Sequence, residues 1–95
     1  MKHPAKLSAR DADVRLSDLP GWTRRGKTLH RVFIFRNFSE AFGFMVRAAL
    51  AAEKLDHHPD WANAWNKVTV DLSTHDAGGL TELDFRLAGE MNRLA

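Results

Sequence analysis

The stretch from residue 28 to residue 55 reads TLHRVFIFRNFSEAFGFMVRAALAAEKL, and its hydrophobic period changes at Asn37. Before Asn37 the chain is rich in Val, Ile and Phe on both faces, which is typical of a strand that is covered on both sides or pairs with another subunit. After Asn37, apolar residues recur every three or four positions, which is the period of an α-helix. These residues are Phe38, Phe42, Met45, Ala49, Ala52 and Leu55. We therefore expect a strand over 28–36 and then a helix that Asn37 caps and that buries this stripe.

Two shorter elements are expected before this stretch. Ser8 is a suitable N-cap for a short helix over about 9–18, and the Pro-Gly pair at 20–21 would end that helix. Residues 22–24 form a short run that a turn at 26–27 joins to the following strand. So short a connection links antiparallel strands, so this part of the chain predicts a β-hairpin.

A loop, a strand and a helix are expected after the long helix, which should end near Leu55 because Pro59 disfavours helical geometry at the residue before it. Residues 56–63 are polar and predict a loop, whereas residues 67–73 alternate apolar and polar side chains like a half-buried strand. A flexible turn follows at 76–79. Thr81 then caps a final helix. Its apolar stripe consists of Leu83, Leu87, Met91 and Leu94.

The order of these elements predicts an α+β fold with helices packed on one face of an antiparallel sheet. Three strands are evident from the pattern. With 95 residues, the chain has room for one small domain, expected over 7–95 behind a flexible N-terminal tail over 1–6.

The composition sets limits on the class of protein. There is no cysteine, so neither disulfides nor thiol chemistry is available. No apolar run approaches the roughly 20 residues of a membrane span, and the N-terminus lacks the apolar stretch of a secretory signal, so we expect a cytoplasmic protein without a membrane partner. The net charge of +2 divides into +6 over 1–36 and −4 over 37–95. Because the basic residues are scattered, we do not expect a nucleic-acid partner.

Three of the five histidines lie at the ends of predicted elements. His57 and His58 follow the long helix, and His75 follows the last predicted strand. Imidazole exchanges protons near neutral pH, so these positions are candidates for general acid and base catalysis. Adjacent side chains in extended backbone point in opposite directions, so His57 and His58 should have different roles.

Other interpretations of the same residues remain open. A zinc site is disfavoured because there is no Cys, no His-x-His and no His-Glu-x-x-His. A serine hydrolase is disfavoured because the chain lacks the G-x-S-x-G elbow that carries the nucleophile. Asp84 sits three residues after Thr81 and would complete a capping box, which is a purely structural role. Trp61 and Trp65 are suited to a core or an interface.

The spacing Glu53-x3-His57-His58-Pro59-x5-Trp65-x9-His75-x8-Asp84 resembles the signature of the pterin-4a-carbinolamine dehydratases. The resemblance extends from about Leu7 to the C-terminus. It implies helices on one side of a four-stranded antiparallel sheet, the fourth strand being a short one near 60–63 or in the tail. It also implies loss of water from a 4a-hydroxytetrahydropterin to give quinonoid dihydropterin, without a metal or an organic cofactor.

The resemblance also assigns roles to residues. It implies that His57 and His75 form the acid and base pair, and that His58 mainly orients the pterin. It implies a pocket lined by Asp56, His57, His58, Ser73, Thr74, His75 and Asp76. Trp22, Trp65 and Asp84 are candidates for either the pocket or the structure.

Partners are implied in the same way. The substrate is a small pterin, and the metabolic link is to an aromatic amino-acid hydroxylase. We expect a homo-oligomer, a dimer with a tetramer as the alternative, because the strand over 28–36 is apolar on both faces and Phe44 lies off the main helical stripe. Two alternatives stay open. One is a binding module, since animal members bind a homeodomain transcription factor and promote its dimerisation. The other is a pterin role near molybdopterin metabolism.

Overall fold

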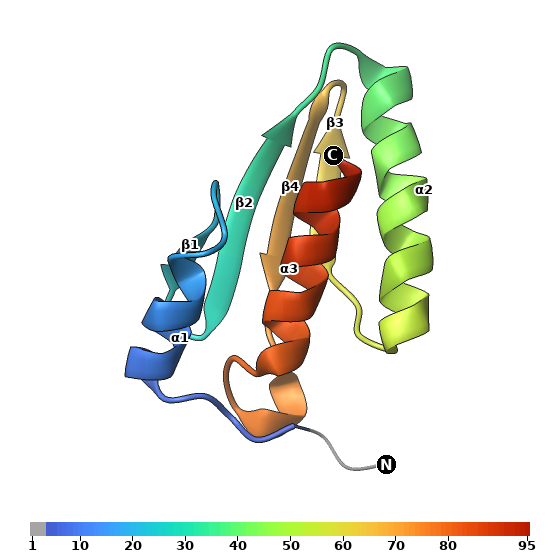
Figure 1. Ribbon diagram of the computed structural model, residues 1–95. Coiled ribbons are helices and arrows are strands. Elements are labelled where there is room, and N and C mark those ends of the chain that lie inside the picture. Colours follow the sequence, from blue (N-terminus) through green and yellow to red (C-terminus); the bar gives the residue numbers. More distant parts are fainter. Residues whose placement is uncertain (1–3) are drawn as a thin grey trace.

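Four antiparallel strands form one sheet in the order β1-β2-β4-β3. In the computed structural model, residues 4–95 are described (Figure 1). Residues 1–3, which belong to the predicted tail and include His3, lie outside the described residues. The strands are β1 (Thr23–Arg25), β2 (Thr28–Ile34), β3 (Asp60–Ala64) and β4 (Lys67–Leu72). The helices are α1 (Ala9–Leu16), α2 (Phe38–Leu55) and α3 (Glu82–Leu94), with a short 3-10 helix, η1, over His75–Ala77.

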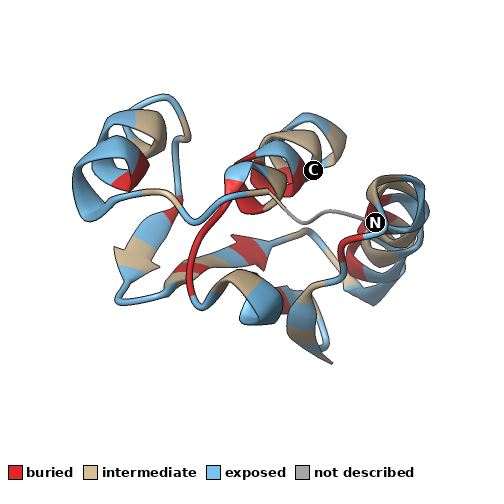
Figure 2. Cartoon of the chain, turned by 90° about the horizontal axis from the view of Figure 1, so that it is seen from below, coloured by how far each residue is buried: buried red, intermediate tan, exposed pale blue. Residues whose placement is uncertain are grey.

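All three α-helices lie on one side of the sheet, as Figure 2 shows. The central pair, β2 and β4, places Leu29 opposite Leu72 and Phe33 opposite Val68, and all four side chains are buried beneath the helices. The opposite face of β2 carries Val32 and Ile34, which are exposed in the described chain. The predicted α+β fold is confirmed, and so is the four-stranded sheet that the family resemblance implied.

The predicted buried stripe of α2 is only partly right. The residues that face the sheet are Ala41, Phe44, Ala48 and Ala52, whereas Phe38 and Phe42 are 52% and 54% exposed. Helix α2 carries two apolar stripes, and the sheet selects the one rich in alanine, whose small side chains let the helix lie close. Phe44 then fills the core with its ring centroid 4.7 Å from that of Phe33. Phe44 is therefore a core residue, and using it as a sign of an oligomer interface was wrong.

The fourth strand, β3, spans Asp60–Ala64, close to the position near 60–63 that the family resemblance offered, and it overlaps the stretch over 56–63 that the local pattern predicted to be a loop. It pairs antiparallel with β4 at the edge of the sheet. Asp, Ala and Asn have low strand propensity, so local sequence gives little signal for β3. Asn63 supports the hairpin by donating from its side-chain amide to the carbonyl oxygens of Trp65 and Lys67. The strand conformation of β3 therefore depends on backbone pairing with β4 rather than on the strand propensity of its own residues.

The segment after β4 is also more ordered than the predicted flexible turn. It forms η1, and Thr74 pairs with Gly79 in an isolated antiparallel bridge. Gly78 allows this closure because its φ is +75°, in the left-handed region that glycine adopts without strain. The segment therefore presents Thr74 and His75 at a defined place beside the start of α3.

Helix α1 braces the first turn of α3. Arg15 donates to both carboxylate oxygens of Glu82, at 3.2 and 3.1 Å. Hydrogen bonding to the Arg15 guanidinium, and its charge, lower the pKa of the Glu82 carboxyl group. The Leu7 amide also donates to the Leu80 carbonyl at 2.8 Å. These contacts tie the N-terminal part of the described chain to the helix end that holds Asp84.

Candidate active site

The exit from α2 directs His57 into the protein. Asp56 ends the helix in the left-handed conformation, with φ 51° and ψ 44°, and its backbone N–H donates back to the carbonyls of Ala52 and Glu53. Asp tolerates this conformation better than most residues because its short polar side chain can bond locally. The His57 amide also donates to the Ala52 carbonyl at 3.1 Å. The chain therefore turns sharply, and the His57 imidazole enters the protein beside α3.

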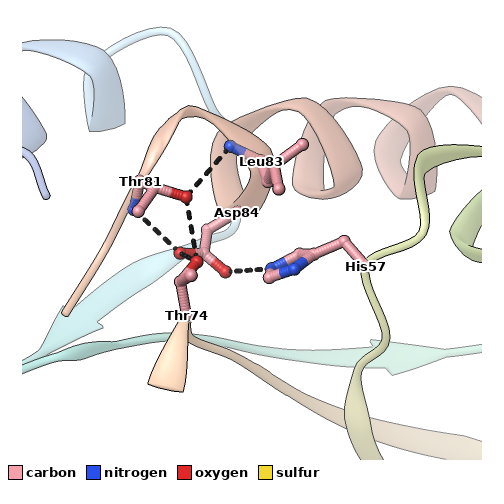
Figure 3. A network of polar contacts seen from close by, with 5 residues as sticks. All are labelled: His57, Thr74, Thr81, Leu83 and Asp84. Atoms are coloured by element: carbon pink, nitrogen blue, oxygen red, sulfur yellow. Dashed lines mark hydrogen bonds and ion pairs between the residues drawn. The ribbon is translucent and has the colours of Figure 1, made fainter. Parts of the chain in front are cut away.

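His57 meets a buried carboxylate there. Its Nε2 lies 2.6 Å from Oδ1 of Asp84, whose side chain is fully buried. The other carboxylate oxygen, Oδ2, accepts hydrogen bonds from the Thr74 hydroxyl at 2.8 Å and from the Thr81 amide at 2.9 Å. Figure 3 shows that this network joins the exit of α2, the exit of β4 and the start of α3. The network places His57 against segments that are distant in sequence.

The Asp84 carboxylate both caps α3 and contacts His57. The capping box predicted from Thr81 and Asp84 is present. The position of Asp84 in the first turn of α3 also places its charge at the positive end of the helix dipole. In addition, Oδ1, the oxygen that the capping box leaves unused, contacts Nε2 of His57. One carboxylate therefore caps α3 through Oδ2 and contacts His57 through Oδ1.

A small cleft of about 250 Å³ opens beside this network. It gathers every residue that the sequence assigned to the pocket, together with Leu83. The lining residues are Asp56, His57, His58, Ser73, Thr74, His75, Asp76 and Leu83. Sequence reasoning missed Leu83 as a lining residue; its place in the first turn of α3, directly before Asp84, is the signal that pointed to it. With three imidazoles and two exposed carboxylates, the cleft has groups able to give and take protons near neutral pH.

His58 and His75 lie on the outer part of the cleft. Nε2 of His58 is 2.6 Å from Oε1 of Glu53, in the last turn of α2, and both side chains are exposed. His57 and His58 thus contact different partners, as expected for adjacent residues. His75 is the first residue of η1 and is also exposed. The cleft therefore combines one buried imidazole with two that solvent reaches.

The two tryptophans proposed for either the pocket or the structure both lie away from the cleft lining. Trp22 is buried, donates from Nε1 to Oδ1 of Asn92 at 2.8 Å, and meets Phe33 edge to face. Trp65 occupies the turn between β3 and β4 with φ 50° and is 67% exposed. Trp61 is half-buried against the core. Trp22 therefore has a structural environment, whereas Trp65 is a surface residue.

No group of three or more His, Cys, Asp or Glu side chains within residues 4–95 is arranged to hold a metal ion. None of the helices in this range has the length and apolar character needed to cross a bilayer.

Comparison with known proteins gives consistent results. The sequence profile of the family described as "Pterin 4 alpha carbinolamine dehydratase" matches residues 5–94. A protein of Afipia carboxidovorans named as a pterin-4-alpha-carbinolamine dehydratase is 61% identical over 91 residues, covering 94% of this chain and 91% of its own. A protein of Chelativorans sp. with the same name is 56% identical, with 95% and 94% covered.

A solved structure agrees with the fold. The crystal structure of a transcriptional coactivator/pterin dehydratase from Brucella melitensis superposes with a TM-score of 0.92. It is 48% identical in sequence and covers 95% of this chain and 98% of its own.

Proposed function

The chain belongs to the pterin-4-alpha-carbinolamine dehydratase family and is therefore a hydro-lyase, and we propose that it removes water from a 4a-hydroxytetrahydropterin to give quinonoid dihydropterin. This reaction needs a proton delivered to the leaving hydroxyl group and a proton taken from a ring nitrogen. Imidazoles positioned on a bound substrate supply both, and each such transfer contributes roughly 10²–10⁴ in rate. The protein therefore needs a cleft with more than one imidazole.

One observation carries the proposal, namely the meeting of His57, His58 and His75 in the cleft of about 250 Å³. We assign the two proton transfers to His57 and His75, which reach the cleft from the exits of α2 and β4. His58 orients the pterin, and Glu53 holds the His58 imidazole through the contact at Nε2. Asp56, Ser73, Thr74 and Asp76 complete the lining.

The direct test is the dehydration of synthetic 4a-hydroxytetrahydropterin by the purified protein, followed by absorbance. Because the carbinolamine also dehydrates without enzyme, the assay compares the rate with protein against the rate in buffer. We expect a large acceleration that saturates with substrate. A rate equal to that in buffer, from protein with native circular dichroism, would contradict the proposal.

The metabolic setting follows from this substrate. We propose that the reaction takes place in the cytoplasm and returns pterin to an aromatic amino-acid hydroxylase. A related pterin role near molybdopterin metabolism is the alternative, and the same assay with different pterin side chains distinguishes the two.

We also propose that the chain forms a homodimer through the outer face of α2. Four large apolar side chains along this face are 48–68% exposed. They are Phe38, Phe42, Val46 and Leu50, spaced four residues apart. We call this set the outer stripe. Such a stripe is self-complementary when two helices pack about a two-fold axis.

A binding module is the second candidate function, and the outer stripe is the observation that favours it. The Brucella melitensis protein is called a transcriptional coactivator as well as a pterin dehydratase. A chain that exposes this stripe and lacks dehydratase activity would fit that candidate better.

A further inference from the structure

We propose that Thr74 is a positioning residue that acts through Asp84 on His57. Its hydroxyl holds the Asp84 carboxylate so that the hydrogen of the neutral imidazole stays on Nε2, and Nδ1 is then the nitrogen that accepts the substrate proton. This inference rests on the proposed function, because it identifies the working atom of a histidine assigned there to proton transfer.

The directions of the hydrogen bonds follow from the contacts. The single hydroxyl hydrogen of Thr74 is donated to Oδ2 of Asp84. The Thr81 hydroxyl lies 2.9 Å from the Thr74 hydroxyl, so Thr81 must be the donor of that pair. The Thr81 hydroxyl in turn accepts from the Leu83 amide at 3.3 Å. A one-way chain therefore runs from Thr81 through Thr74 to Asp84.

The remaining contact of Asp84 fixes the hydrogen on His57. A single hydrogen lies between Nε2 and Oδ1, which are 2.6 Å apart. Imidazole is intrinsically more basic than a carboxylate. The Thr74 hydroxyl and the Thr81 amide both donate to Oδ2 of Asp84, so this carboxylate is an acceptor in its other contacts as well. The hydrogen therefore belongs to Nε2, and Asp84 accepts three hydrogen bonds.

Nδ1 is left for the substrate. Within residues 4–95, the hydrogen bond of the His57 ring is made by Nε2. In the same range, no buried side-chain nitrogen or oxygen lacks a partner, so an unpartnered Nδ1 must be reached by solvent. Because His57 lines the cleft, this access is from the cleft. Nδ1 of the neutral ring then has a free lone pair and is a proton acceptor.

The step balances as a dehydration. Nδ1 of His57 takes the proton from a ring nitrogen of the carbinolamine, and the freed electron pair forms the new double bond to C4a. The C4a–O bond breaks, and the departing oxygen takes a proton from His75 to become water. The imidazolium formed at His57 is stabilised by the Asp84 carboxylate, and both histidines return to their starting states by exchange with water.

The test measures the tautomer directly. In protein labelled with ¹⁵N, long-range correlation spectra distinguish a protonated from an unprotonated ring nitrogen, and His57→Ala identifies the His57 signals. At a pH where the ring is neutral, we expect the wild-type protein to show Nε2–H only. We expect Thr74→Val to show a mixture with the Nδ1–H form and to lower kcat about tenfold at unchanged KM. Thr74→Ser keeps the hydroxyl and should restore both.

The matched control is Thr69→Val, the same substitution on the outer face of β4, which should leave the spectrum and kcat unchanged. An Nδ1–H ring in the wild-type protein would overturn the inference even if Thr74→Val failed to fold. An unchanged His57 spectrum or a normal kcat in folded Thr74→Val would overturn it as well. A dehydration rate no faster than in buffer for the folded wild-type protein would instead overturn the proposed function, so the two failures are distinguishable.

Discussion

Nε2 of His57 lies 2.6 Å from Oδ1 of Asp84, although the two residues are 27 positions apart in the chain. His58 makes a contact of the same length with Glu53, yet the two pairs differ in solvent exposure. The side chains of His57 and Asp84 are 10% and 0% exposed, whereas those of His58 and Glu53 are 56% and 74% exposed. Exposed pairs are worth only ~0–1 kcal/mol because water competes for both partners. The buried pair therefore constrains its imidazole strongly, and the exposed pair leaves its imidazole adjustable.

The three histidines should contribute unequally to the reaction. Replacing His57 or His75 with Ala removes a proton-transfer group, so kcat should fall ~10²-fold or more. Replacing His58 removes a contact that orients the pterin, so KM should rise with a smaller change in kcat. Steady-state kinetics on the three variants, with circular dichroism to confirm folding, provides the measurement.

The double variant of His57 and His75 adds a further check. If either single change disables the same step, the double variant should lose much less than the product of the two single losses. Near-normal kcat in both folded single variants would rule out the assignment of the two proton transfers to His57 and His75.

Asp84→Asn should lower both stability and kcat. The amide keeps an acceptor for the capping box but loses the charge that the Thr74 hydroxyl, the Thr81 amide and the His57 ring all contact. Loss of a helix cap costs ~1 kcal/mol, and perturbing a buried charged network adds to that cost. Thermal unfolding and kcat measured together separate the two roles. A loss of stability with unchanged kcat would mean that Asp84 only caps α3.

Turnover should not require a metal ion. The chain has no cysteine, and two of the cleft imidazoles already use Nε2 in contacts with carboxylates. Dialysis against a strong chelator should therefore leave kcat and KM unchanged. A large loss of activity that added zinc restores would show this prediction to be wrong.

Two phenylalanines of α2 should differ sharply in their effect on folding. Phe44 is fully buried against Phe33 and Phe35, so Phe44→Ala should lower the free energy of unfolding by ~3–5 kcal/mol. Phe42 is half exposed, so Phe42→Ala in the monomer should cost ~1 kcal/mol or less. Chemical denaturation at low protein concentration measures both. Equal losses would mean that α2 packs on the sheet by a different face.

The outer stripe should control association. Light scattering of the wild-type protein should give a mass of at least twice 10.7 kDa at micromolar concentration. Phe42→Glu places a charge in the middle of the stripe and should shift the mass to that of the monomer with the fold retained. Arg10→Glu, at an exposed position of α1, is the control and should not change the mass. A wild-type monomer at this concentration would refute the proposed dimer and favour a partner of another kind.

The sequence alone determined the features that depend on neighbours along the chain. The helical period after Asn37, the caps at Ser8, Asn37 and Thr81, and the alternation over 67–73 all report local geometry, and each appears in the structure. Residue spacing also marked the histidines and the family. The three histidines stood out because they lie at the ends of predicted elements, whereas the full set of pocket residues came from the family resemblance.

Tertiary structure decided whatever depends on contacts distant in sequence. Helix α2 has two apolar stripes, and only packing against Phe33 and Phe35 selects the one that contains Phe44. Strand β3 exists because β4 supplies its hydrogen-bond partners. The pairing of Asp84 with His57 arises where the exit of α2 meets the start of α3. Periodicity specifies which residues share a face, but a partner for that face exists only once the chain has folded.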